Sequence, residues 1–137
     1  MSVQAGTSEL LLKLPARAEY LMFSRLVLTG LSRAIEIDPE ALADLKLAVS
    51  EACSYAIRSS GEGEGTIAVR YELREDAVAV DVEAELSSTG PAVGEEVMGE
   101  GDLGLAIIRA VVDELEVEQA GDGQVSRISF RKSLAEG

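Results

Sequence analysis

The sequence predicts a two-layer α/β sandwich of the α+β class, in which helices cover one face of an antiparallel or mixed β-sheet. Three observations support this fold class. The chain has 137 residues, 47% of them hydrophobic, which suits one globular domain spanning residues 1–137. Segments with strand-like and helix-like periodicity follow the order β-α-α-β-β-α-β-β. This order lacks the regular β-α-β alternation that is typical of a doubly wound parallel sheet.

The first half of the chain predicts one strand and two helices. An apolar run over residues 9–14 indicates a strand that ends at Pro15, because proline has no N–H to donate to a sheet. From Ala18, apolar residues spaced by three and four indicate a helix that ends before Asp38. Asp38 is a capping carboxylate just ahead of a proline, so a second helix begins there. The apolar stripe of this second helix contains Leu42, Leu45, Val49, Ala52 and Ala56.

The middle of the chain predicts a β-hairpin followed by a long loop. Residues 66–73 and 77–84 alternate between apolar and polar with period two, as expected of half-buried strands. Residues 86–101 are polar and rich in glycine, so no regular element is expected there. Loops of this length are often functional.

The last third of the chain predicts a helix and a second hairpin. Leu103 to Val112 is strongly apolar with helical spacing, and Asp102 is well placed as its N-cap. Residues 115–118 and 125–130 indicate two closing strands. We expect residues 1–8 and 133–137 to be flexible ends.

Charge and composition exclude several classes of function. Twelve Lys and Arg against 25 Asp and Glu, with no histidine, give a net charge of −13. This balance disfavours binding to nucleic acid or to anionic membranes and favours a basic protein partner. The longest apolar runs are much shorter than the roughly 18 residues that can span a bilayer.

The cysteine and histidine counts narrow the chemistry further. One cysteine cannot form an intramolecular disulfide, and without histidine there is neither a Cys/His zinc site nor a Ser-His-Asp or Cys-His catalytic group. Residues 1–7 do not resemble a secretion signal, so we expect a cytoplasmic protein. Cys53 is then expected to be a small buried hydrophobic residue.

Two stretches resemble the bacterial anti-sigma serine kinases, which share an ATPase superfamily with gyrase B, the chaperone Hsp90 and histidine kinases. Residues 44–56 (DLKLAVSEACSYA) are similar to the helix that carries the first nucleotide box. Residues 101–114 (GDLGLAIIRAVVDE) are similar to the glycine box and the helix that follows it. The element order agrees from Leu11 to about Ser133. The resemblance implies the histidine kinase/Hsp90-like ATPase fold and a role in transcription regulation during bacterial stress responses.

The first box of that family is Glu-x-x-x-Asn, whose glutamate activates the attacking hydroxyl and whose asparagine holds magnesium. Glu51 matches the glutamate, but Tyr55 stands four residues later in place of the asparagine. That spacing puts both side chains on one face of a helix. A neutral phenol is a poor magnesium ligand, so we expect Tyr55 either to fill the former metal site or to be an ordinary half-buried aromatic. Glu51 is the candidate catalytic base, or otherwise a solvated carboxylate.

The other two boxes also depart from the family pattern. In the second, an Asp-x-Gly-x-Gly whose carboxylate binds adenine, Glu85 is the candidate stand-in, while Leu86 and Ser88 replace glycines. In the third, Asp102 replaces the first glycine and Gly104 keeps the second, with Gly101 one residue earlier. Asp102 is also a plain N-cap candidate, and both glycines could serve helix packing instead of phosphate approach.

The segment between Arg74 and Arg109 contains no basic residue. Its nine carboxylates would repel the phosphates of a nucleotide, each by about 4 kcal/mol at 4 Å and an effective dielectric near 20. They form either a solvated face or a partner surface, for which we name Glu95, Glu96 and Glu100. The nine are Glu75, Asp76, Asp81, Glu83, Glu85, Glu95, Glu96, Glu100 and Asp102.

These observations predict a regulatory protein of the anti-sigma type with weak or lost ATP binding, and no required cofactor. The resemblance implies a sigma factor or an anti-anti-sigma protein as its partner, or a second copy of the chain. The alternative is an active protein serine kinase that uses ATP and magnesium, with Glu51 as its base. Function depends on sites and not on the fold, so the fold alone does not decide between them.

Overall fold

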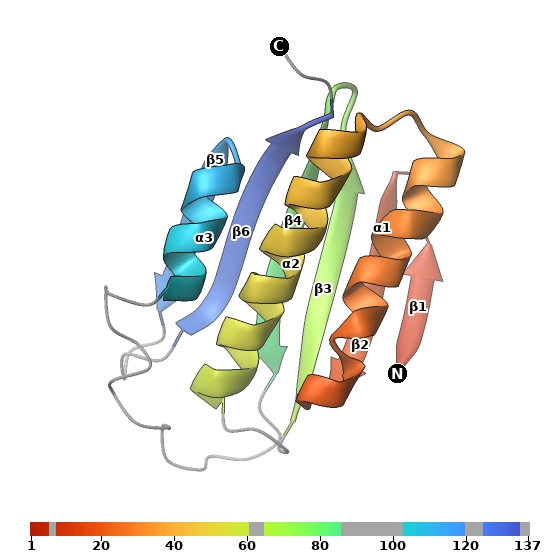
Figure 1. Cartoon of the computed structure of the whole chain (residues 1–137). Helices are drawn as coiled ribbons and strands as arrows, with labels where there is room; N and C mark the ends of the chain where they lie inside the picture. The colour runs from red at the N-terminus through yellow and green to blue at the C-terminus, as the bar shows by residue number, and fades with distance from the viewer. Residues whose placement is uncertain (6–7, 61–64, 86–102, 120–124, 135–137) are drawn as a thin grey trace.

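The structure is a computed structural model that describes residues 1–5, 8–60, 65–85, 103–119 and 125–134. Three α-helices lie across one face of a single β-sheet, with α2 between α1 and α3 (Figure 1). This is the predicted two-layer sandwich. The elements, in chain order, are β1 Ser2–Ala5, β2 Glu9–Pro15, the 3-10 helix η1 Ala18–Tyr20, α1 Met22–Ala34, α2 Pro39–Ser60, β3 Thr66–Leu73, β4 Ala77–Glu85, α3 Leu103–Val111, β5 Glu114–Gln119 and β6 Val125–Ser133.

The six described strands have the order β1-β2-β3-β4-β6-β5, and each neighbouring pair among them is antiparallel. Of the two predicted alternatives, the antiparallel sheet is therefore correct and the mixed sheet is not. The reason is the position of β6. A strand that follows β4 through a helix would lie parallel to β4 if the two were adjacent, but β6 separates β5 from β4.

Parts of the two predicted flexible ends, residues 2–5 and 133–134, lie in or beside the sheet. Ser2–Ala5 form the edge strand β1, in which Val3 pairs with Leu12 of β2. At the other end, Ser133 closes β6, and the N–H of Leu134 donates to the carbonyl of Asp76 at 2.9 Å. The predicted loop over residues 86–101 lies outside the described residues.

Helix α2 is the centre of the helical layer. Its start agrees with the prediction, since an Asp38 carboxylate oxygen accepts the N–H of Glu40 at 3.1 Å. The predicted stripe is buried at Leu45, Val49 and Ala52, all with no exposed surface. Among the described residues, none of the helices is both long and apolar enough to cross a bilayer.

A buried polar cluster fixes the start of α1 to the sheet. The fully buried Ser24 donates its hydroxyl to the carbonyl of Leu21 at 2.7 Å, and its own carbonyl accepts the Tyr71 hydroxyl at 2.7 Å. Cys53 of α2 lies in the same region, and burial raises its pKa to about 12. The thiol is therefore protonated at neutral pH, in agreement with its predicted role as a buried hydrophobic residue.

Candidate functional site

The second half of α2 carries the residues of the first nucleotide box. Tyr55 is only 1% exposed and belongs to the hydrophobic core. The guanidinium carbon of Arg58 lies 5.5 Å from the centre of the Tyr55 ring, and a guanidinium nitrogen of Arg58 donates to the Ser54 hydroxyl at 3.1 Å. The ring is thus held between the core and a cation that stacks on it. Tyr55 is therefore buried and not half-buried, which was one of the two predicted alternatives.

Glu51 lies one helical turn before Tyr55 and is partly exposed. Its neighbour Ser50 accepts a hydrogen bond from Arg25 of α1 at 2.9 Å, so a polar contact joins α1 and α2 there. No ion pair or side-chain hydrogen bond of Glu51 is found within the described ranges. The structure therefore brings Glu51 and Tyr55 to one stretch of α2, as the helical spacing predicts.

The end of β4 does not bring Glu85 to the helices. Val78, Val80 and Val82 are buried beneath the helices, and side chains alternate between the two faces of a strand. Glu85 therefore lies on the outer face, where its carboxylate accepts the Thr66 hydroxyl at 3.0 Å and pairs with Lys13 at 3.6 Å.

The residue that faces the helices at this strand end is Ala84. Its methyl group has no hydrogen-bonding capacity, so the position offers no carboxylate to an adenine amino group. The placement of Glu85 argues against its predicted role as the stand-in for the family's aspartate. The alternation that starts at Val78 was the signal for this, because it assigns residue 84 and not residue 85 to the helical side.

Helix α3 supplies the last box residue that the structure describes. Gly104 is buried in the first turn of α3, and α3 packs against α2. Leu105 and Ile108 of the same helix reach the core. The other predicted positions, Gly101, Asp102, Glu95, Glu96 and Glu100, lie outside the described residues.

Comparison with known proteins identifies the family. The sequence model of the protein family described as the histidine kinase-like ATPase domain matches residues 14–130. The chain belongs to this family. The ATPase-type fold predicted from residues 44–56 and 101–114 is thereby confirmed.

Curated relatives of this histidine kinase-like ATPase domain include serine-protein kinases. The serine-protein kinase RsbW of Listeria innocua is 37% identical over 120 residues, which cover 77% of this chain and 76% of that protein. The RsbW of Bacillus pumilus is 34% identical over 135 residues, covering 87% and 83%. The predicted resemblance to anti-sigma serine kinases is confirmed at this level.

A solved structure supports the fold. It contains the RsbU and RsbW domains of a Mycobacterium tuberculosis protein, and it superposes with a TM-score of 0.70 at 20% identity. The match covers 98% of this chain but 34% of the other, so the chain corresponds to one part of that larger protein.

The described residues do not fit the magnesium nucleotide that this family implies. Where the family has a magnesium-holding amide, the chain has a buried phenol covered by a guanidinium. Where the family has an adenine-binding carboxylate, the helix-facing residue is Ala84. No group of three or more His, Cys, Asp or Glu within the described part of the chain could hold a metal ion.

Sequence reasoning missed Arg58, the cation nearest to the first box. The sequence indicates this contact, because Arg58 follows Tyr55 by three residues on a predicted helix. Side chains three residues apart on a helix are neighbours.

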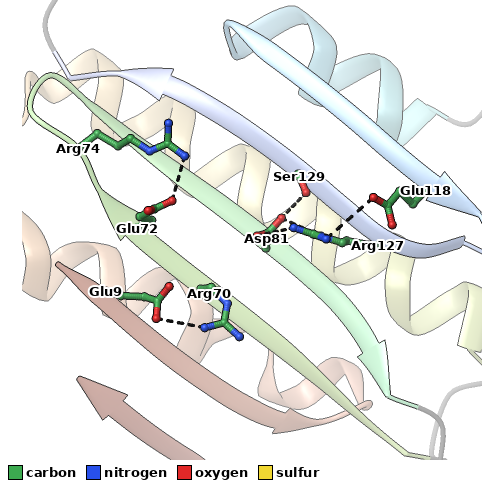
Figure 2. A network of polar contacts seen from close by, with 8 residues as sticks. All are labelled: Glu9, Arg70, Glu72, Arg74, Asp81, Glu118, Arg127 and Ser129. Atoms are coloured by element: carbon green, nitrogen blue, oxygen red, sulfur yellow. Dashed lines mark hydrogen bonds and ion pairs between the residues drawn. The ribbon is translucent and has the colours of Figure 1, made fainter. Parts of the chain in front are cut away.

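The outer face of the sheet carries a network of ion pairs that the linear charge count also missed (Figure 2). Arg127 of β6 donates two hydrogen bonds to the Asp81 carboxylate of β4, at 3.1 and 3.0 Å, and Ser129 donates a further one. Arg127 also lies 3.9 Å from Glu118. Asp81 and Glu85, two of the nine carboxylates in the segment that lacks basic residues, are therefore paired with basic residues from other strands. The pairs of Arg70 with Glu9 and of Arg74 with Glu72 extend the network.

This network lowers the pKa of Asp81. Partial burial acts to raise the pKa of the carboxyl, but the hydrogen bonds from Arg127 and Ser129 and the Arg127 charge outweigh it. A carboxylate with a lowered pKa in the folded state stabilises the protein above its unfolded pKa of about 4, and loses this contribution as the pH falls through the folded value.

We expect Asp81→Asn to reduce the free energy of unfolding by about 1 kcal/mol at neutral pH, since the pair is partly exposed and screened by solvent. The difference from wild type should be smaller at a pH below the lowered pKa of Asp81, where this carboxyl is itself protonated, than at neutral pH. Urea unfolding at both pH values measures this. Glu114→Gln, which removes the more exposed pair with Arg131, is the control and should change stability little. A deficit that is equal at both pH values would contradict the assignment.

Proposed function

We propose that this chain is a regulatory protein of the anti-sigma type that acts by binding a protein partner, with nucleotide binding weak or lost. The observation that carries the proposal is the burial of Tyr55, which is 1% exposed at the position of the family's magnesium-holding asparagine. A ligand that used this position would have to displace a side chain of the hydrophobic core.

Two further features support weak nucleotide binding. Ala84 gives the end of β4 no carboxylate on the helical side. Magnesium prefers hard oxygen ligands such as carboxylates and amides, and a neutral phenol below a guanidinium is a poor substitute. The fold would then have been kept for its surface and not for phosphoryl transfer.

The proposed partner is a sigma factor or an anti-anti-sigma protein, with a second copy of the chain as a further possibility. The relatives named RsbW and the net charge of −13 both support a partner with a basic surface. We propose Glu95, Glu96 and Glu100 as the residues that meet it. The predicted cytoplasmic location agrees with such a partner.

An active serine kinase remains the second candidate function, and two observations favour it. The two relatives named above, which are 37% and 34% identical to this chain over the aligned residues, are serine-protein kinases. Arg58 also places a guanidinium, which is well suited to phosphate, beside the first box. In that case Glu51 acts as the base, and the hydroxyl to be phosphorylated lies on the partner.

The proposal is tested by measuring association with sigma factors and anti-anti-sigma proteins of the source organism, without nucleotide. We expect binding in the absence of ATP, and we expect Glu95→Lys with Glu96→Lys to slow association by about tenfold at low salt. The control Glu83→Lys with Glu116→Lys makes the same charge change on the outer sheet face. Equal slowing by both pairs would assign the effect to net charge alone. Partner binding that strictly requires ATP would contradict the proposal.

A further inference from the structure

A cleft lies at the end of the molecule opposite the nucleotide boxes. The α1–α2 connection, the β3–β4 turn and the end of β6 meet there, whereas α2 and β4 end, and α3 begins, at the other end (Figure 1). The cleft has a volume of about 670 Å³. Its apolar floor is formed by the partly buried Ile35, Ile37, Leu73 and Leu134, and the exposed Pro39 also lines the cleft.

Backbone hydrogen bonds hold the walls of this cleft together. The N–H of Asp38 donates to the carbonyl of Leu134 at 3.0 Å, and the N–H of Leu134 donates to the carbonyl of Asp76 at 2.9 Å. The β3–β4 turn is closed by the N–H of Arg74, which donates to the carbonyl of Ala77 at 2.8 Å. The three segments are therefore fixed to one another before any ligand binds, which lowers the entropic cost of binding.

The rim of the cleft is acidic. Glu36 and Asp38 come from the α1–α2 connection, and Glu75 and Asp76 come from the β3–β4 turn. Among the described residues of the lining, Arg74 is the one basic residue, and it pairs with Glu72 at 2.9 Å. An apolar floor below four carboxylates and one paired guanidinium suits an apolar side chain flanked by positive charges.

We propose that this cleft is a docking site for a short segment of a partner protein in which leucine-like side chains alternate with lysine or arginine. A second copy of the chain is disfavoured as the occupant because each copy carries a net charge of −13. Nucleic acid is disfavoured because the rim would repel its phosphates. The cleft adds a contact surface to the proposed function and does not depend on the loss of nucleotide binding.

The probe for this site is a short fluorescein-labelled peptide of alternating lysine and leucine, whose binding to the full chain is followed by anisotropy. We expect Glu36→Lys with Glu75→Lys to weaken binding by about tenfold or more, because both carboxylates lie at the rim. The matched control, Glu83→Lys with Glu116→Lys, should change the affinity by less than about twofold. Ile35→Gln should weaken binding by about fivefold through loss of apolar contact, whereas Leu26→Gln on the exposed face of α1 should not.

Two peptide controls separate the apolar from the charged contribution. The same peptide with glycine in place of leucine, and the one with glutamate in place of lysine, should both bind more weakly than the original. Glycine-peptide binding as tight as that of the original, or equal weakening by both charge-reversal pairs, would overturn the proposal. A peptide that fails to bind the wild-type chain would also overturn it.

A second measurement keeps the test independent of variant folding. Amide chemical shifts of the wild-type chain should change at residues 35–38, 73–76 and 134 when the peptide is added. Shifts centred on the outer sheet face would overturn the proposal. Because the cleft lies away from the boxes, adding MgATP should leave the peptide affinity unchanged, so a failure of the nucleotide argument and a failure of this one give different results.

Discussion

Replacing Tyr55 with asparagine should lower the free energy of unfolding by about 3 kcal/mol or more and should not give the protein micromolar affinity for MgATP. The stability loss follows from the burial of the ring, since removing a large core side chain leaves a cavity and a buried amide without its partners. The affinity stays low because the substitution restores one box only. Ala84 still offers no carboxylate to the base.

The measurements are urea unfolding and calorimetric titration with MgATP on the same preparation. Tyr55→Phe is the matched control, because it keeps the ring in the core and should cost much less stability. Micromolar binding by Tyr55→Asn would show that the other two boxes are intact and that Tyr55 alone blocks the site. This outcome would assign the loss of nucleotide binding in the wild-type chain to Tyr55 alone and would contradict the argument from the other boxes.

Replacing Ile108 with alanine should lower the free energy of unfolding by roughly 2–5 kcal/mol, the usual range for truncating a fully buried isoleucine. Ile108 attaches α3 to the core beside α2, so its loss should also loosen the helix that opens with the buried Gly104. Hydrogen exchange should then quicken in α3 before it quickens in β3 and β4.

Leu103→Ala on the same helix is the control for this effect. Leu103 is 72% exposed, so its truncation should change stability by less than about 0.5 kcal/mol. Similar losses for both variants would contradict the described packing of α3.

Much of the fold could be predicted because local pattern and tertiary burial agree. The alternation in residues 66–73 and 77–84 predicts the central hairpin, and the carboxylate of Asp38 caps the start of α2 as its position indicates. Strand β1 is not predicted, because four residues are too few to show a strand periodicity. It is defined by its pairing with β2 in the folded chain. The mixed sheet could not be excluded because strand order depends on where β6 inserts.

The candidate site was predicted less completely. Helical spacing was enough to bring Glu51 and Tyr55 together, but a residue count along the chain cannot show that Asp81 meets Arg127 from a distant strand. The charge of Glu85 makes it a candidate for the second box, whereas the strand alternation, which is visible in the sequence, places it on the outer face. The charge of a residue makes it a candidate for the site, and the face of the helix or strand on which it lies decides which other residues it can contact.

The most direct test of the central claim is the melting temperature of the wild-type chain with and without millimolar MgATP. A ligand at 100 times its dissociation constant stabilises a protein by about 2.7 kcal/mol, which for a domain of this size raises the melting temperature by several degrees. With Tyr55 in the core at the magnesium position, we predict a change of less than about one degree. A rise of several degrees that depends on magnesium would contradict the proposal that nucleotide binding is weak or lost.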